Sequence, residues 1–328
     1  MISAVEFRRF KALRHARVAL QPFNLVIGPN GSGKTSLIEA IQRLRVLAAL
    51  PVADDAATPS RVGGPEIDFS FDTPDNGILV RLSCVAETTC DLLRVFPSGA
   101  PGWAALRERL RGMRGYMLDH AVIGRSAPIV ETAVVRSDGS NLAAVLLGWR
   151  EHAPAVFAEF SAEVLRILPE FSAVELREDA GRVELALRLE GEGILPVHEL
   201  SQGTLYLVAL LALAFDPNPP AVMCLEEVDR GMHPRTLREV RDALYRLSYP
   251  AAFGMKRGPV QIIATTHSPY LIDLFRDHPE EVVIAQKQGR AAHFERLSDR
   301  ADLPELLANG SLGDMWYSGI LGGVPEER

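Results

Sequence analysis

The chain has 328 residues, of which 47% are hydrophobic, so it can bury a full core as one large domain or two small ones. Its formal net charge of -7 argues against a protein that coats nucleic acid by bulk electrostatics, although a local basic face is compatible with this balance. No apolar run approaches the roughly 20 residues of a membrane span, and Met1 to Glu6 lack the plan of a signal peptide, so we expect a cytoplasmic protein with no membrane partner.

The three cysteines, Cys84, Cys90 and Cys224, show neither C-x-x-C spacing nor a nearby histidine cluster. A zinc site is therefore not indicated. We expect all three to be reduced thiols within the core, which is the usual state in a cytosolic protein.

Residues 2–7 and 17–20 are predicted to form paired strands at the start of the chain. The basic turn between them carries Arg8, Arg9 and Lys11. These cations are suited to DNA or to a partner's phosphates, and a solvated turn with scattered charge explains them equally well.

The stretch over residues 28–35 reads GPNGSGKT and fits the phosphate-binding pattern G-x-x-x-x-G-K-[ST] at every fixed position. Residues 23–27 have the apolar character of a buried strand, and residues 36–41 have that of a helix. The pattern therefore sits in the strand-loop-helix context that it requires. It predicts a site for a nucleoside triphosphate.

The chemistry of this loop follows from its residue types. Its glycines allow successive backbone N–H groups to point at phosphate oxygens, and the helix N-terminus adds a partial positive charge. We expect Lys34 to reach the β and γ phosphates and the Thr35 hydroxyl to hold Mg²⁺. The expected nucleotide-binding residues of the loop are Asn30, Gly31, Ser32, Gly33, Lys34, Thr35 and Ser36.

Beyond the helix, which is expected to stop at Pro51, the pattern changes to alternation. Residues 67–72 and 78–82 alternate on either side of the turn dipeptide Asn76-Gly77, and residues 92–96 continue in the same way. This predicts a layer of antiparallel strands.

Residues 97–190 are predicted to form an inserted module of helices and a hairpin. Two helices broken near Pro154 are expected over residues 141–168, and strict alternation predicts a hairpin over residues 174–189. The module begins with an arginine-rich helical segment over residues 103–114 that is suited to DNA or a partner, although an amphipathic helix with a solvated face is the commoner origin of such a pattern. Its cations are Arg107, Arg111 and Arg114.

In the second half, Ser201 precedes the apolar helix over residues 205–213 and is placed as its N-cap. Residues 221–225 form a continuous apolar run typical of a central parallel strand, and Glu226 and Glu227 follow it. Charges at the carboxyl end of such a strand lie where open α/β sheets bind ligands. We expect Glu226 to accept the hydration shell of Mg²⁺ and Glu227 to polarise an attacking water.

A further buried strand over residues 260–266 ends at His267. A histidine in this position can donate a hydrogen bond to a γ-phosphate and so report its loss. A single histidine is more often structural, but the order of the motifs favours the functional interpretation.

Together these motifs resemble the ABC-type ATPases of the SMC and RecF-like group, and most closely the small AAA-type ATPases related to the ATPase half of OLD-family proteins. The resemblance implies an α/β P-loop NTPase fold of ABC-ATPase type, with a mixed sheet, an antiparallel β layer and an inserted helical and β module. The expected domains are residues 1–96 and 191–328, which form the two ATPase lobes, and the module at 97–190. The residues that carry the resemblance are 23–41, 138–142, 200–204, 225–227, 232–234 and 265–269.

The resemblance also implies ATP and Mg²⁺ as cofactors and a head-to-tail homodimer with the nucleotide between its subunits. Ser201 and Gly203 then contact the γ-phosphate held by the other subunit, and Asp229 lies on a loop at the dimer seam. Glu227 is the implied hydrolytic base, His267 the switch and Lys34 a further catalytic residue.

Three features depart from the group's usual pattern. Glu226 replaces the more common Asp. The signature motif at residues 200–204 ends in Thr204, where Gln or Glu is frequent. No glutamine can be assigned to the Q-loop, since Gln42 lies in the wrong element. We therefore expect slow hydrolysis.

The leading functional hypothesis is an ATP-dependent dimerising switch that acts with DNA or with an effector protein, in phage defence or DNA repair. An OLD-like nuclease is an alternative, but the tail after His267 has no clear cluster of metal-binding carboxylates. An ATP-binding scaffold with little turnover is another. A GTPase or P-loop kinase is disfavoured because no N-K-x-D motif occurs.

Overall fold

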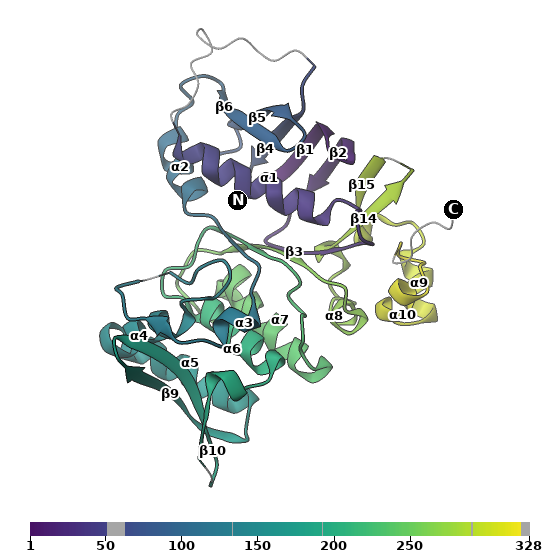
Figure 1. Cartoon of the computed structure of the whole chain (residues 1–328). Helices are drawn as coiled ribbons and strands as arrows, with labels where there is room; N and C mark the ends of the chain where they lie inside the picture. The colour runs from purple at the N-terminus through teal and green to yellow at the C-terminus, as the bar shows by residue number, and fades with distance from the viewer. Residues whose placement is uncertain (51–62, 133, 192, 290, 323–328) are drawn as a thin grey trace. The chain divides into compact units, whose positions relative to one another are not determined.

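The computed structural model describes residues 1–50, 63–132, 134–191, 193–289 and 291–322 (Figure 1). The chain divides into two compact units. The first comprises Met1–Gly115, Pro220–Val228 and Arg257–Arg328, and the second comprises Tyr116–Pro219 and Asp229–Lys256. The domain boundaries expected at residues 97 and 190 stay a prediction.

The first unit contains a six-stranded mixed sheet in the order β15-β14-β3-β13-β12-β7. At its centre β3 (Phe23–Ile27) pairs in parallel with β13 (Gln261–Thr265) and β14 (Val282–Gln288), and β13 pairs in parallel with β12 (Val222–Leu225). All residues of β3, β12 and β13 are buried, as predicted for the three strands. The sheet is completed by β15 (Ala291–Arg296), antiparallel to β14, and β7 (Arg114–Tyr116).

The predicted antiparallel layer is confirmed as a five-stranded sheet in the order β2-β1-β4-β5-β6. The basic turn is shorter than expected, because only Lys11 and Ala12 lie between the first two strands. The strands are β1 (Ile2–Phe10), β2 (Leu13–Ala19), β4 (Glu66–Phe71), β5 (Leu79–Ala86) and β6 (Thr89–Phe96).

Helix α1 (Lys34–Ala49) leaves the phosphate loop and packs between the two sheets of this unit (Figure 1). Its buried Leu37, Ile41 and Leu44 share one hydrophobic cluster with Phe7 of the antiparallel sheet and Ile263 of the mixed sheet. Helix α2 (Trp103–Arg111) packs against α1 and is shorter than the segment predicted at 103–114. The apolar area that anchors α1 fixes the position of the loop before it.

The expectation of three reduced thiols is wrong for two of them. Cys84 and Cys90 form a disulfide, because the pairing of β5 with β6 places them directly opposite each other. Cys224 is free and buried, and burial raises the pKa of its thiol to about 12. The prediction of a reduced thiol within the core is therefore confirmed for Cys224 and wrong for the other two cysteines.

The second unit contains a helical layer and a small antiparallel sheet. The two helices predicted on either side of Pro154 are α4 (Leu142–His152) and α5 (Pro154–Ile167), and the predicted hairpin is β9 (Phe171–Asp179) with β10 (Arg182–Leu189). Helix α6 (Gln202–Phe215) packs against α5 and α7 (Pro234–Ser248) and is buried from Leu205 to Ala214. The short elements are α3 (His120–Ile123), β8 (Ala127–Pro128), β11 (Ile194–Pro196), η1 (Val197–Glu199) and η2 (Pro250–Phe253).

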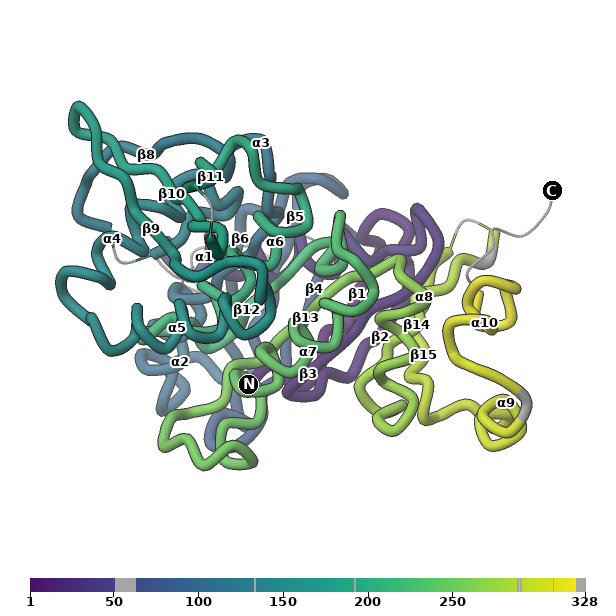
Figure 2. The backbone as a smooth tube through the Cα atoms, turned by 90° about the horizontal axis from the view of Figure 1, so that it is seen from below, coloured from purple at the N-terminus to yellow at the C-terminus, as the bar shows by residue number. Residues whose placement is uncertain are grey.

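The C-terminal part of the first unit adds short helices after β13. Helix α10 (Leu312–Tyr317) packs against α8 (Pro269–Asp273) (Figure 2), and a Cβ on Gly313 would lie 2.6 Å from the carbonyl oxygen of Pro269. The remaining elements are η3 (Pro279–Glu281), η4 (Leu297–Asp299) and α9 (Leu303–Asn309). Among the described residues, no helix has both the length and the apolar character needed to cross a membrane.

Candidate nucleotide site

The topology of the mixed sheet brings three strand ends to one edge. Leu225 of β12 and Leu25 of β3 both pair in register with Ala264 of β13, so the three parallel strands end at nearly the same level. The segments that follow them meet there and line a pocket of about 190 Å³. It is lined by Lys11, Ala12, Asn30, Gly31, Ser32, Gly33, Lys34, Thr35, Ser36, Glu226, Glu227, Thr265 and His267.

The phosphate loop requires glycine at two positions for different reasons. A Cβ on Gly28 would lie 2.3 Å from the backbone oxygen of Ala285, so the loop passes too close to β14 for any side chain. Gly33 has a φ of 104°, and a Cβ there would lie 3.0 Å from the side chain of Leu13. The conformation of the loop therefore favours glycine at both positions.

The side chain of Ser32 indicates whether the loop is suited to a phosphate group. Its side chain is buried, with an exposed fraction of 1%, and its Oγ has no hydrogen-bond partner among the described residues. A buried hydroxyl without a partner is costly, and a phosphate oxygen in the loop supplies the missing acceptor. The residues present therefore fit a bound phosphate group.

Lys34 occupies the base of the pocket. Its ammonium donates hydrogen bonds to the backbone oxygens of Gly28 and Pro29, the latter at 3.1 Å. Burial lowers the pKa of Lys34 to about 8, and the negative charge of Glu227 opposes this decrease. Phosphate oxygens are stronger acceptors than carbonyl groups, so a triphosphate would stabilise the charged form of Lys34.

The acidic side of the pocket suits a divalent cation. Burial raises the pKa of the Glu226 carboxyl above its ordinary value, and the negative charges of Glu227 and Glu39 raise it further. A nearby cation would remove this repulsion. The Thr35 hydroxyl lines the same pocket, and the two oxygen ligands suit Mg²⁺, which keeps several of its waters when it binds.

Glu227 and His267 complete the edge of the pocket, and both are exposed. The backbone of Glu227 has a φ of 50°, in the left-handed region that is unusual for a glutamate. Its N–H donates a hydrogen bond to the Oγ1 of Thr265 at 2.9 Å. Thr265 was not predicted as a site residue, although it belongs to the segment 265–269 that carries the resemblance and it ends a buried strand with a hydroxyl.

The other expected nucleotide-binding residues, Ser201, Gly203 and Asp229, belong to the second unit, whereas the pocket is lined by the first unit alone. Ser201 caps α6, because its Oγ accepts a hydrogen bond from the N–H of Thr204 at 3.1 Å. A Cβ on Gly203 would lie 2.6 Å from the backbone oxygen of Gly231. The signature is therefore in contact with the turn that follows Asp229.

The cations expected to contact DNA all have interaction partners within the chain. Arg8 forms ion pairs with Glu6, Glu66 and Asp68, and Lys11 pairs with Glu39 beside the nucleotide pocket. Arg9 donates to the backbone oxygen of Gly63, Arg107 donates to those of Ala48 and Leu50, and Arg111 pairs with Glu108; Arg114 also has an interaction partner. Contact with DNA through these side chains would have to compete with these interactions, and it stays a prediction.

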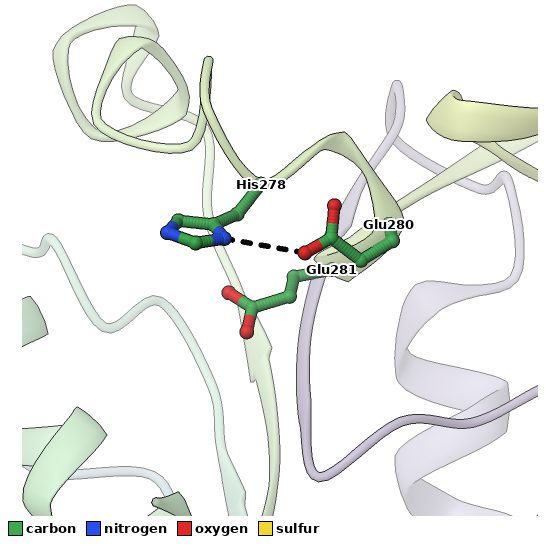
Figure 3. Close-up of side chains that lie close together, drawn as sticks. All are labelled: His278, Glu280 and Glu281. Carbon is green, nitrogen blue, oxygen red and sulfur yellow. Dashed lines mark hydrogen bonds and ion pairs between the residues drawn. The ribbon is translucent and has the colours of Figure 1, made fainter. Parts of the chain in front are cut away.

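A second group of titratable side chains, drawn in Figure 3, lies immediately before β14. His278, Glu280 and Glu281 have ligand atoms within 4.8 Å of one another, and the Nδ1 of His278 is hydrogen-bonded to Glu280 at 3.2 Å. Around Zn²⁺, neighbouring ligand atoms lie roughly 3.4 Å apart, given bonds of about 2.1 Å. None of these three residues lines the nucleotide pocket.

Two protein-family models match separate parts of the chain. A model described as an AAA domain, putative AbiEii toxin, Type IV TA system, matches residues 135–273, and a model described as an AAA ATPase domain matches residues 1–55. No curated protein matches the chain.

Solved structures of SMC head domains resemble the chain over most of its length. An SMC head bound to the C-winged helix domain of ScpA aligns with a TM-score of 0.60 and 15% identity, covering 90% of this chain and 97% of that one. The SMC head domain from Thermotoga maritima aligns with a TM-score of 0.51 and 16% identity, covering 90% and 98%. An Smc head with an extended coiled coil, bound to the C-terminal domain of ScpA derived from Pyrococcus furiosus, aligns with a TM-score of 0.56 and 13% identity, covering 94% and 99%.

These similarities confirm the predicted fold class. At identities of 13% to 16% they establish the fold and leave the activity of this chain to be argued from its own residues. The relation to the OLD family stays a prediction.

Proposed function

We propose that this chain, an ABC-type ATPase of the SMC and RecF-like group by its fold, binds and hydrolyses ATP at the pocket on the edge of the mixed sheet. The observation that carries the proposal is that one pocket is lined by the phosphate loop, the two glutamates after β12 and the histidine after β13. These segments lie far apart in the sequence, so their convergence is a property of the fold.

In this proposal the loop holds the phosphates and Lys34 neutralises their charge. Backbone N–H groups and the Ser32 hydroxyl contact the phosphate oxygens, and the Lys34 ammonium exchanges its carbonyl acceptors for oxygens of the β and γ phosphates. Thr35 and Glu226 hold Mg²⁺, which when bound neutralises charge that develops on the phosphates. These are electrostatic contributions that need no covalent step by the protein.

Glu227 and His267 act on the terminal phosphate. A water attacks the γ-phosphorus, the bond from phosphorus to the β–γ bridging oxygen breaks, and the Glu227 carboxylate accepts the proton that the water loses. His267 donates a hydrogen bond to a γ-phosphate oxygen, and this contact disappears when the phosphate leaves.

We infer that a second copy of the chain completes the site. The pocket of about 190 Å³ is smaller than the roughly 300–1,000 Å³ of typical ligand sites, so it suits a triphosphate tail better than a whole nucleotide. Ser201 and the N-terminus of α6 belong to the second unit and offer an anion-binding surface of their own. In a head-to-tail homodimer this surface, with Gly203 and Asp229, would contact the γ-phosphate held by the other copy.

ATP would then favour the closed dimer, and hydrolysis would release it. We propose that this cycle acts on an effector protein or on DNA, in phage defence or DNA repair. The support for a protein partner is that two of the similar SMC heads are bound to domains of ScpA. The support for defence is the description of the AAA family model as a putative toxin of a Type IV toxin–antitoxin system.

Phosphate release from ATP and Mg²⁺ by the purified chain tests the proposal. We expect slow turnover by the wild type, no nucleotide binding by the Lys34→Ala variant, and ATP binding with turnover lowered about 100-fold in the Glu227→Gln variant. Glu108→Gln, which alters an exposed carboxylate of α2, is the matched control and should keep the wild-type rate. A wild-type chain that does not bind ATP would exclude the function.

A further inference from the structure

Glu227 adopts a backbone conformation that a glutamate does not adopt freely. Its φ of 50° lies in the left-handed region, where the Cβ of a non-glycine residue crowds the following peptide. Such a conformation persists only where the surrounding structure holds it. The contacts that hold Glu227 therefore determine where its carboxylate lies.

Two hydrogen bonds from the end of β13 hold this segment. The N–H of Glu227 donates to the side-chain Oγ1 of Thr265 at 2.9 Å, and the N–H of Val228 donates to the backbone oxygen of the same residue at 3.0 Å. The regular pairing of β12 with β13 ends one residue earlier, at Leu225 and Ala264. Thr265 thus extends the hydrogen bonding between β13 and the segment after β12 beyond the paired strands. Its hydroxyl accepts one of these hydrogen bonds in place of a backbone oxygen.

The burial of Thr265 strengthens the hydrogen bond between its hydroxyl and the Glu227 N–H. Its exposed fraction is 4%, so water competes little for the hydroxyl. Neither of the hydrogen bonds that Lys34 makes to the phosphate loop involves Thr265. A change at its hydroxyl therefore acts on Glu227 and leaves the Lys34 contacts of the loop in place.

We propose that Thr265 is the positioning residue of the hydrolytic site, and that its hydroxyl holds the strained backbone of Glu227 so that the carboxylate faces the attacking water. The inference rests on the proposed role of Glu227 as the base. Without the hydroxyl, the Glu227 N–H loses its buried acceptor and the backbone relaxes to a commoner conformation. The carboxylate then leaves its position, while the contacts that bind the phosphates remain.

A matched pair of variants separates the hydroxyl from the shape of the side chain. Thr265→Val keeps the branched shape and removes the acceptor, whereas Thr265→Ser keeps the acceptor and removes a methyl group. We expect Thr265→Val to lower kcat about 10- to 100-fold, since a displacement of about 1 Å has effects of this size. Its Kd for ATP should stay within about twofold of the wild type, and Thr265→Ser should restore most of kcat.

A double variant tests whether Thr265 acts through Glu227. In the Glu227→Gln background, Thr265→Val should cause little further loss of kcat, because the base is already removed. If Thr265→Val unfolds the chain, Thr265→Ala removes the same hydroxyl in a smaller side chain, and circular dichroism identifies which variants are folded. The inference is overturned if folded Thr265→Val or Thr265→Ala turns over ATP at the wild-type rate, if Thr265→Ser is equally slow, or if the losses in the double variant multiply.

The failure of the inference differs from that of the proposed function. If Glu227→Gln hydrolyses ATP at the wild-type rate, Glu227 is not the base, and the role of Thr265 fails with it. If Glu227→Gln is inactive and Thr265→Val is fully active, the base remains and only the positioning role is excluded.

Discussion

Lys34 is the residue whose charge depends most on whether phosphates are bound. It is buried, it donates to two backbone oxygens of its own loop, and its pKa is lowered to about 8. An ammonium in this state is poorly solvated, and Glu227 supplies a negative charge that acts on it. When a triphosphate binds, the Lys34 ammonium forms an ion pair with its phosphate oxygens. This ion pair raises the pKa of Lys34 in the complex.

This change predicts that ATP affinity falls at high pH. The free protein keeps Lys34 protonated below about pH 8 and loses the proton above it, whereas the complex keeps the proton to higher pH. Binding must then take up a proton, and the Kd for ATP should rise about tenfold from about pH 7 to about pH 9. Equilibrium titration with a fluorescent ATP analogue measures this dependence.

Lys34→Arg is the control for that titration. A guanidinium stays charged over this range, so the variant should bind more weakly than the wild type but with a nearly constant Kd. An equal pH dependence in the two proteins would assign the effect to a group other than Lys34.

The N-terminus of helix α6, in the second unit, is suited to an anion. Ser201 accepts a hydrogen bond from Thr204 and leaves other N–H groups of the first turn available to a ligand. The close approach of Gly203 to Gly231 connects this turn to the segment after Asp229. A nucleotide on this surface would thus contact two motifs that are adjacent in the fold.

The structural and ligand-binding roles of Ser201 can be separated with a second N-cap. Ser311 caps α10 in the same way, with its Oγ accepting from the N–H of Asp314 at 3.0 Å. Replacement of either serine by alanine should lower the free energy of unfolding by about 1 kcal/mol in urea denaturation. Only Ser201→Ala should also weaken the ATP-dependent dimer. An equal effect of both variants on the dimer would reduce Ser201 to a structural cap.

The elements of this fold were predictable where a local pattern determines them. The phosphate loop, the helix break at Pro154 and the buried strand before Glu226 follow from periodicity and turn chemistry. The bond from Glu227 to Thr265 joins residues 38 positions apart, and the disulfide depends on the register of β5 with β6. Contacts of this kind arise from the pairing of strands, which no single segment specifies.

At the scale of the whole molecule, the phosphate loop and the signature lie in different compact units. The pocket is lined by the first unit alone and is small for a nucleotide. In a head-to-tail pair of chains, each nucleotide would contact the phosphate loop of one copy and the N-terminus of α6 of the other copy. This arrangement would explain why the second unit has a helix N-terminus suited to phosphate but no phosphate loop. We therefore propose that ATP joins two copies of the chain.

Light scattering on the Glu227→Gln variant with saturating ATP and Mg²⁺ tests this claim most directly, because the variant should bind ATP without consuming it. We predict a mass twice the 35.9 kDa of the chain in the presence of ATP, a monomer without ATP, and a monomer in both conditions for Lys34→Ala. A Glu227→Gln variant that binds ATP and remains monomeric would contradict the account.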